Sequence, residues 1–285
     1  MKLDTDKKVL LVGLGLIGGS YAAAFSRAGY EVGAVDPNAE SIAFAIQNQF
    51  ISTGRTEPEK AYLENFDIVV FALYPHVLLE WVEKYAQFLK PNAFLTDVTG
   101  VKSGLVGRVQ ELLPKGMEFV GAHPMAGREV SGVQNARADL FRDANYIVTP
   151  TEKNTEEGIR LCEEMGRVLG VGSISRLTPR EHDEMIGFLS QLTHCIAVAL
   201  MTCKESRHLV DYTGDSFRDL TRIAKINEDM WTELFLWNRE ELLEQMDLFL
   251  NHFASLRDAL KNEDVETMKS MMRLSTQRRK YFDKP

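Results

Sequence analysis

Apolar and polar positions alternate along the first 150 residues or so in a regular way. Short apolar runs, which predict strands, are separated by segments with helical periodicity. Because the runs are apolar almost throughout, both faces of the strands must be covered, which indicates a parallel sheet between helices. The predicted strands are residues 8–13, 31–35, 67–73, 93–97 and 119–121, and the predicted helices are residues 17–28, 41–48 and 78–89.

The pattern changes near residue 177. A strand at 146–149, a helix at about 155–169 and a last strand at 171–177 complete the sheet pattern. The segment 178–181 (TPRE) then forms a capping box with proline at the first helical position, so a helix begins there. Glycine and proline are almost absent afterwards, which predicts an all-helical last third. We therefore expect two domains, residues 1–177 and 178–285.

The helical third is more apolar than a small bundle requires. Between residues 234 and 250, apolar side chains cover more than one helix face, and such a helix is normally buried. A homodimer explains the excess, although a compact monomeric bundle remains the alternative. The residues are Leu234, Phe235, Leu236, Trp237, Leu242, Leu243, Leu248, Phe249 and Leu250.

Composition narrows the classes of partner. The chain has 33 basic and 41 acidic residues, a net charge of -8, which argues against nucleic-acid binding but permits a local basic pocket for an anionic substrate. Its three cysteines form no CxxC pair, which is typical of reduced thiols in a cytoplasmic protein and indicates neither disulfides nor a metal site. The apolar N-terminal run lacks a signal peptide's flanks, and we expect no membrane span.

A glycine-rich turn follows the first predicted strand and opens the first predicted helix. It reads Gly13-Leu14-Gly15-Leu16-Ile17-Gly18, a GxGxxG motif in the context that dinucleotide binding requires. Gly13 permits the tight turn, Gly15 lets the backbone approach a pyrophosphate, and Gly18 allows close packing of helix and strand. The helix start, with Leu16 and Ile17, offers free amides to the phosphates. The alternative is a glycine turn without a ligand.

An acidic residue lies where the ribose of the cofactor would be bound. Asp36 ends the second predicted strand, about 20 residues beyond the glycines, as expected for the acceptor of the ribose hydroxyls. A carboxylate there repels a 2′-phosphate, so we expect NAD rather than NADP. Arg55 lies too far along the chain to be the usual phosphate partner.

Three later segments carry polar side chains that the fold alone does not need. His123 and Glu129 lie in AHPMAGRE, directly after a predicted strand, at the edge where α/β sheets bind ligands. The segment 190–194 (SQLTH) places polar side chains on one helix face, which could equally be a helix–helix contact. Arg222 belongs to a stripe of basic side chains in 217–225 (FRDLTRIAK). Such a stripe is normally a solvent-exposed helix face, but a guanidinium there can also bind a carboxylate.

These motifs occur in the same order in a known family. GLGLIGGS at 13–20, DVTGVK at 97–102, AHPMAGREVSG at 122–132, the SxLxH helix and FRDLTRIA at 217–224 resemble prephenate and arogenate dehydrogenases of tyrosine biosynthesis. The resemblance implies a Rossmann-type domain followed by a helical dimerisation domain. It also implies NAD-dependent oxidative decarboxylation of prephenate to 4-hydroxyphenylpyruvate, or of arogenate to tyrosine.

The resemblance also implies roles for individual residues. His123 matches the catalytic histidine, whose neutral imidazole accepts the hydroxyl proton as hydride departs. Arg222 and His194 match substrate-binding residues, Glu129 matches an acid near the pocket mouth, and Asp219 is expected to hold Arg222 or its helix in place.

The chain departs from the family pattern at two places. Thr99-Gly100 replaces a common Gly-Ser whose serine holds the reacting hydroxyl, so Thr99 is expected to supply an equivalent oxygen. Gln191, another expected substrate contact, replaces the first histidine of a family motif, and Thr193 replaces a proline. These departures leave open an NAD-binding regulatory protein that has lost catalysis. A β-hydroxyacid dehydrogenase or imine reductase is a further alternative, but such enzymes usually rely on a lysine in the helical part.

Overall fold

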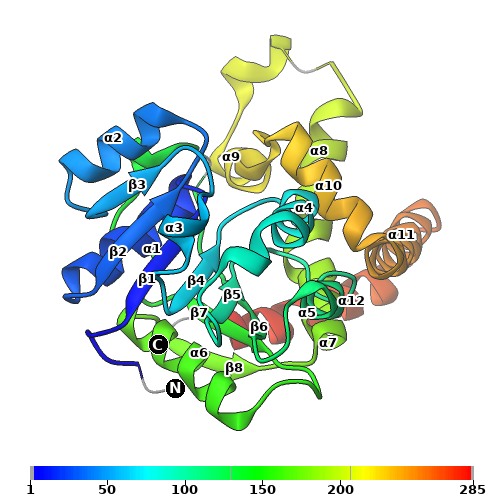
Figure 1. Ribbon diagram of the computed structural model, residues 1–285. Helices are drawn as coiled ribbons and strands as arrows, with labels where there is room; N and C mark the ends of the chain where they lie inside the picture. Colours follow the sequence, from blue (N-terminus) through cyan, green and yellow to red (C-terminus); the bar gives the residue numbers. More distant parts are fainter. Residues whose placement is uncertain (1–2, 129, 206, 284–285) are drawn as a thin grey trace. The chain divides into compact units, whose positions relative to one another are not determined.

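The computed structural model describes residues 3–128, 130–205 and 207–283. Its first half is an eight-stranded sheet in the order β3-β2-β1-β4-β5-β6-β7-β8 (Figure 1). Strands β1 to β6 are parallel to one another, β7 runs antiparallel to β6, and β8 is parallel to β7. The strands are β1 Lys8–Val12, β2 Glu31–Val35, β3 Thr53–Arg55, β4 Ile68–Phe71, β5 Phe94–Asp97, β6 Glu118–Pro124, β7 Asn145–Thr149 and β8 Ser173–Arg176.

Helices cover both faces of this sheet, which confirms the predicted α/β class. Successive residues of β1 point to opposite faces, so Val9 and Leu11 join one buried cluster and Leu10 and Val12 join the other. On the first face lie α1 Leu16–Arg27, α2 Ala39–Gln47 and α6 Glu156–Val168, and on the second lie α3 Lys60–Leu63, α4 Pro75–Tyr85 and α5 Val106–Leu112.

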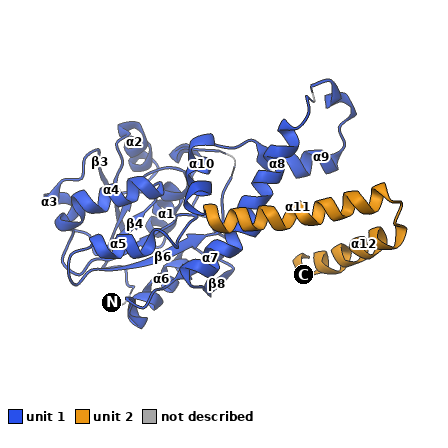
Figure 2. Cartoon of the chain, turned by 90° about the vertical axis from the view of Figure 1, so that its right-hand side faces the viewer, with its two compact units in different colours: residues 1–238 blue, residues 239–285 orange. Residues whose placement is uncertain are grey.

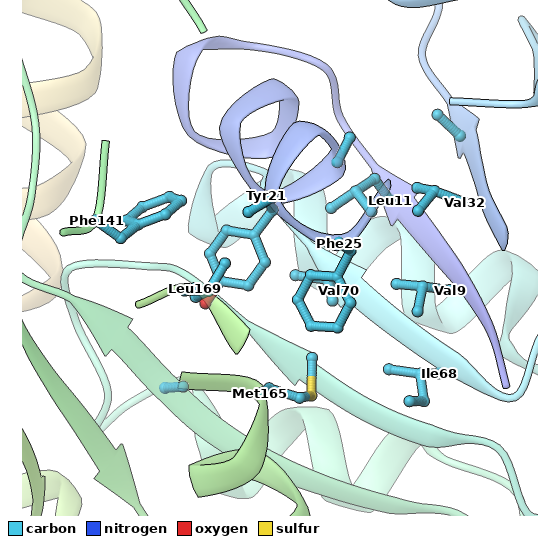
Figure 3. Packing of buried hydrophobic residues seen from close by; sticks show 14 of the residues in the cluster. Val9, Leu11, Tyr21, Phe25, Val32, Ile68, Val70, Phe141, Met165 and Leu169 are labelled. Carbon is cyan, nitrogen blue, oxygen red and sulfur yellow. The ribbon is translucent and has the colours of Figure 1, made fainter. Parts of the chain in front are cut away.

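The helix that follows the glycine turn is fixed to the sheet by aromatic packing. Tyr21 and Phe25 of α1 lie over the strand residues of the first face, and Phe141 packs against Tyr21 with ring centroids 5.0 Å apart (Figure 3). Tyr21, Phe25 and Phe141 are fully buried. The turn at residues 13–18 is therefore held between a buried strand and a buried helix.

The strand order reverses between β1 and β4. From β1 the chain continues through β2 and β3 toward one edge, and from β4 through β5 and β6 toward the other. The connecting loops at the carboxyl ends diverge at this point, which is where open α/β sheets bind ligands. The glycine turn after β1 and the loop after β5 both lie at this carboxyl edge.

Some predicted elements differ from the observed ones. A strand is predicted to end at 121, but β6 continues to Pro124, so His123 lies within the strand and pairs with Ile147 of β7. A wholly parallel sheet is predicted, but the β6–β7 pair is antiparallel. Strand β3 has the sequence TGR, which contains no apolar run to reveal it.

Helices follow the sheet, and the predicted helix start at Thr178 is confirmed. The Thr178 side chain accepts from the Glu181 amide, and the Glu181 side chain accepts from the Thr178 amide. One π-helical turn, Gly187–Gln191, separates α7 from α8. The helices are α7 Pro179–Ile186, α8 Leu192–Thr202, α9 Asp215–Thr221 and α10 Glu228–Trp237, with short turns η4 Arg207–Tyr212 and η5 Arg222–Ala224.

The continuous helical run Pro179–Thr202 is long and apolar enough, by length and composition, to cross a membrane. This corrects the expectation that no such stretch exists, because the polar side chains at 190–194 include no Asp, Glu, Lys or Arg and lower the hydropathy of the run little. A single such helix is weak evidence, since the core helix of a soluble protein passes the same test.

The chain divides into two compact units, residues 1–238 and 239–285 (Figure 2). The second unit consists of α11 Arg239–Lys261 and α12 Val265–Arg279, which pack against each other. Helices α7 to α10 belong to the first unit together with the sheet. The domain boundary near residue 177 marks the change from sheet to helices and stays a prediction.

Candidate active site

The glycine turn requires glycine at two of its three motif positions for steric reasons. Gly13 has φ +97°, and a Cβ there would lie 2.5 Å from the carbonyl oxygen of Ala72. A Cβ on Gly18 would lie 2.0 Å from the carbonyl oxygen of Gly13, so the start of α1 is pressed against the turn. Both positions therefore exclude any other residue.

Gly15 differs from the other two glycines because its surroundings are open. A Cβ on Gly15 would meet nothing within 4 Å, and the residue is exposed. Gly15 is also the N-cap of α1, and no side chain caps the helix. Leu16 and Ile17 form the first turn, whose amides lack intrahelical partners. The space above Gly15 thus offers an anion both room and backbone donors.

Asp36 is fixed beside this turn. Its Oδ2 accepts from the Leu14 amide at 2.6 Å, and its Oδ1 accepts from the Asn38 amide at 2.8 Å. Arg55 is closer to Asp36 than the sequence suggests, because Arg55 ends β3 and its carbonyl accepts from the Asp36 amide at 3.2 Å. The Arg55 guanidinium lies 4.9 Å from the centre of the Tyr62 ring. The expectation that Arg55 is remote from the ribose site is corrected.

At the carboxyl end of β5, a buried ion pair holds the next part of the site. Lys102 Nζ lies 2.5 Å from Asp97 Oδ2, and both side chains are fully buried. The ammonium also donates to Thr99 Oγ1 at 3.1 Å and to the Ala122 carbonyl at 2.7 Å, which uses all three of its donors. Burial lowers the pKa of Lys102, and the neighbouring Asp97 carboxylate opposes that shift.

The hydroxyl of Thr99 belongs to this buried network. Besides accepting from Lys102, it lies within hydrogen-bond distance of Asp97 Oδ2 and of the Val101 carbonyl. Its residue is 5 % exposed. The structure therefore turns the Thr99 oxygen toward the loop interior.

The same ion pair forms hydrogen bonds to both the amide and the carbonyl of the residue before His123. The Ala122 amide donates to Asp97 Oδ1 at 3.0 Å, and its carbonyl accepts from Lys102. A Cβ built on Gly100 would lie 3.7 Å from His123 Cε1 and 3.9 Å from Nε2. The imidazole edge with Nε2 therefore faces the loop position that lacks a side chain.

The other nitrogen of His123 contacts a second histidine. His123 Nδ1 lies 2.9 Å from His182 Nε2, and His182 Nδ1 lies 2.7 Å from Asp183 Oδ1. Burial lowers the pKa of His123 well below the ordinary histidine range, and the nearby His182 and Lys102 add to this shift. The pKa of His182 is also lowered by burial, against the opposing effect of Asp183. Both imidazoles are therefore neutral near pH 7.

Gln191 lies beneath the site rather than in it. It is 1 % exposed, its Nε2 donates to the Leu234 carbonyl at 3.2 Å, and its Oε1 accepts from Asn238 Nδ2 at 2.7 Å. The same Asn238 group donates to the Asp183 carbonyl at 2.9 Å. Gln191 thus links the π-helical turn before α8 to the end of α10.

His194 is held by stacking on α10. Its ring centroid lies 3.7 Å from that of Trp231, and its Nδ1 lies 2.9 Å from the Ser190 carbonyl. Three residues along the same helix face, Leu234 approaches Gly100, because a Cβ there would lie 3.8 Å from Leu234 Cδ2. One face of α10 therefore contacts both His194 and the loop that faces His123.

The remaining predicted residues lie at the helical end of the site. Arg222 is in η5, which packs against α8, and Asp219 is in α9; both are exposed. Glu129 lies outside the described residues. Helix α10 thus contacts His194 and also the loop beside His123. Arg222 lies in the same helical layer, because η5 packs against α8.

The sequence reasoning missed four buried residues of this network: Asp97, Lys102, His182 and Asp183. Little in the sequence distinguishes His182 and Asp183, because they lie in the charged segment 180–184 at the start of α7, where such side chains are normally exposed. The contact between His123 and His182 spans 59 residues of sequence, so no local pattern could reveal it.

The comparisons with known proteins cover both halves of the chain. Residues 21–174 match the family model described as prephenate dehydrogenase, nucleotide-binding domain, and residues 178–274 match prephenate dehydrogenase, dimerization domain. The prephenate dehydrogenase of Lactococcus lactis is 30% identical over 92% of this chain and 73% of its own length. That of Bacillus subtilis is 28% identical over 91% and 72%.

A solved structure is similar over nearly the whole chain. It is prephenate dehydrogenase from A. aeolicus in complex with hydroxyphenyl propionate and NAD+, with a TM-score of 0.89 and 31% identity. The match covers 97% of this chain and 98% of that one. The likeness therefore includes the sheet, the glycine turn and the helical layer that carries His194.

Proposed function

The chain belongs to the prephenate dehydrogenase family, and on that premise we propose that it oxidatively decarboxylates prephenate to 4-hydroxyphenylpyruvate with NAD. This reaction belongs to tyrosine biosynthesis. The observation that carries the proposal is the placement of His123: one ring nitrogen is bound to a buried partner, and the other faces the loop beside α10.

The cofactor assignment rests on the glycine turn. Gly13 and Gly18 shape the turn, and the open space at Gly15 lies before the uncapped first turn of α1, where Leu16 and Ile17 would meet the pyrophosphate. Asp36 is the candidate acceptor for the ribose hydroxyls, which favours NAD over NADP. When bound, NAD supplies the acceptor for the hydride that leaves the substrate.

The chemistry assigned to this chain is proton transfer and positioning. We assign His123 Nε2 as the base that accepts the proton of the ring hydroxyl while hydride leaves the same carbon. The ring carboxylate departs as carbon dioxide, its bonding electrons complete the aromatic ring, and the product is a phenol, so the imidazolium can return the proton. We assign Thr99, whose oxygen is turned inward, to fixing the loop around Lys102.

The helical layer is assigned to substrate binding. Arg222 is the candidate partner of a substrate carboxylate, because a guanidinium can bind a carboxylate through two hydrogen bonds. Asp219 is proposed to keep Arg222 in position, and His194 to contact the substrate from its stacked position on Trp231. Glu129 is proposed as an acid near the pocket mouth. Gln191 is assigned to support, since both ends of its amide are already engaged.

We further propose a cytoplasmic homodimer with a dinucleotide-binding domain at 1–177 and a substrate and dimerisation domain at 178–285. Large apolar side chains at 188, 189 and 236 in the first unit are exposed, as are those at 248, 250 and 253 in the second. A second copy of the chain would cover such surfaces. Free thiols at all three cysteines support a reducing compartment.

The test is a matrix of prephenate and arogenate against NAD and NADP, read by the absorbance of the reduced cofactor. We expect turnover with prephenate and NAD. Turnover with arogenate alone would move the assignment to the second substrate of the family resemblance.

A second candidate function is an NAD-binding regulatory protein without catalysis. It is favoured by Gly100, which leaves no hydroxyl beside His123 where the family commonly has serine. NAD binding by calorimetry with no reduction of cofactor in any of the four combinations would favour it and overturn the enzyme assignment.

A further inference from the structure

We infer that His182 and Asp183 are positioning residues that fix the proton of His123 on Nδ1 and thereby leave Nε2 free to act as the base. The inference rests on the proposed function, because it concerns the base of that reaction. It assigns a role to two residues that lie at the start of the helical layer, in α7, while the base lies in the sheet.

The three side chains form a continuous chain of hydrogen bonds, in which His182 and Asp183 are buried and His123 is partly buried. His123 Nδ1 and His182 Nε2 are 2.9 Å apart, and His182 Nδ1 and Asp183 Oδ1 are 2.7 Å apart. His182 is 0 % exposed and Asp183 is 1 % exposed. The direction of these bonds is therefore set inside the protein, at the buried carboxylate of Asp183.

The carboxylate at the end of the chain has a fixed role as acceptor. Asp183 Oδ1 also accepts from the Lys102 amide at 2.9 Å, and Oδ2 accepts from the Ser103 amide at 2.7 Å. Both oxygens of Asp183 therefore act as acceptors toward backbone donors. The hydrogen between Asp183 and His182 must consequently be on His182 Nδ1.

This assignment determines the protonation of both rings. A neutral His182 with its hydrogen on Nδ1 has a lone pair on Nε2, which can only accept. The hydrogen between the rings must then belong to His123 Nδ1. A neutral His123 with that hydrogen has its lone pair on Nε2, the nitrogen that faces Gly100 and the helical layer. The nitrogen of His123 that can accept a proton is thus determined by Asp183, two hydrogen bonds away.

The same contacts hold the base while charge develops. When His123 takes a proton on Nε2, its Nδ1–H becomes a cationic donor, and its hydrogen bond to His182 strengthens. Because Asp183 binds the backbone of residues 102 and 103, the chain also ties the base to the loop that carries Gly100. Orientation of the imidazole and placement of the loop therefore depend on one carboxylate.

The test combines two substitutions at position 182 with nuclear magnetic resonance of the imidazole nitrogens. His182→Gln keeps an amide oxygen that can accept from His123 Nδ1, whereas His182→Phe fills the space without an acceptor. We expect kcat of the Phe variant to fall on the order of 10²-fold. We expect kcat of the Gln variant to fall less than about 10-fold. Both variants should bind NAD as the wild type does. His208→Phe, which replaces an exposed histidine outside the network, is the matched control.

In wild-type protein labelled with 15N-histidine, His123 should show its hydrogen on Nδ1, and in the Phe variant this preference should weaken. A hydrogen found on Nε2 of neutral wild-type His123 would overturn the inference even if no variant folds. So would a Phe variant with wild-type kcat and an unchanged His123 signal. Absence of turnover in the wild type, together with the expected hydrogen on Nδ1, would instead remove the proposed function and leave the positioning chain in place.

Discussion

The sheet end and the helical end of the candidate site hold their charged groups in different ways. Around His123, the charged partners Asp97, Lys102 and Asp183 are at most 1 % exposed and bound to one another or to backbone. At the helical end, Arg222 lies in a three-residue turn on exposed surface. The end proposed for proton transfer is preorganised within one chain, while the end proposed for substrate anchoring lies on short surface elements.

The same contrast appears in the apolar surface. Strands β1, β4 and β5 are buried on both faces, so the sheet has no apolar face left to cover. In α11, by contrast, Leu243, Leu248, Leu250 and Phe253 are all exposed. A sheet completed by its own helices needs no partner, whereas the helical part presents surface that a second copy can bury.

The largest expected effect is at the sheet end. His123→Asn keeps a polar side chain but removes the base, and general-base catalysis is worth about 10²–10⁴ in rate. We expect kcat for prephenate to fall about 10³-fold with KM changed little, measured by steady-state reduction of NAD. Turnover near the wild-type rate would remove His123 as the base.

A smaller effect of a different kind is expected at the helical end. Arg222→Ala removes a charge-assisted hydrogen-bond donor worth roughly 1.5–3 kcal/mol, so KM for prephenate should rise about 10–100-fold while kcat changes less. Arg218→Ala is the matched control from the same basic stripe, since Arg218 is exposed and lies 3.9 Å from Asp215. Equal effects of the two substitutions would indicate a solvated basic face and no substrate anchor.

How far the sequence predicts the molecule differs between the two regions. The strands and the glycine turn are predictable because local patterns determine them: an apolar run must be buried, and Gly13 and Gly18 meet backbone oxygens. Strand β3 is not predictable, because its TGR sequence gains its place only from pairing with β2.

Side-chain directions in the helical layer are harder to predict for a specific reason. Gln191 and His194 are expected to share a face, which assumes a regular α-helix. The π-helical turn Gly187–Gln191 inserts an i→i+5 step before α8, and the structure directs Gln191 toward Asn238 and His194 toward Trp231. Contacts such as His123 to His182 depend on tertiary folding and lie beyond any local pattern.

A third prediction concerns the exposed apolar side chains of the second unit. Leu250→Glu places a charge where a partner copy would bury a leucine that is 57% exposed in this chain. We expect the dimer to weaken by about tenfold or more in Kd, observed as dissociation in sedimentation velocity. Asn251→Glu adds the same charge at the neighbouring position and should disturb the dimer less. A monomeric wild type would contradict the dimer proposal directly.

The smallest expected effect is the dependence of stability on pH. Burial lowers the pKa of His182 in the folded protein, whereas in the unfolded chain the imidazole titrates near the ordinary value of about 6.5. Below that pH the unfolded state binds a proton that the folded state does not, so stability falls as the pH decreases and is fully retained above it. The loss is at most about 1.4 kcal/mol per pH unit for this one group.

Because carboxylates also contribute to acid denaturation, the informative quantity is the difference between wild type and His182→Gln. Urea titrations at pH 7.5, 6.5 and 5.5 should show that the variant loses less stability than the wild type between the two lower values. Since the imidazole of His182 is enclosed between His123 and Asp183, this difference reports on the buried chain itself. Identical slopes in the two proteins would mean that His182 titrates in the folded state as it does in the unfolded chain, which an imidazole held neutral by burial would not do.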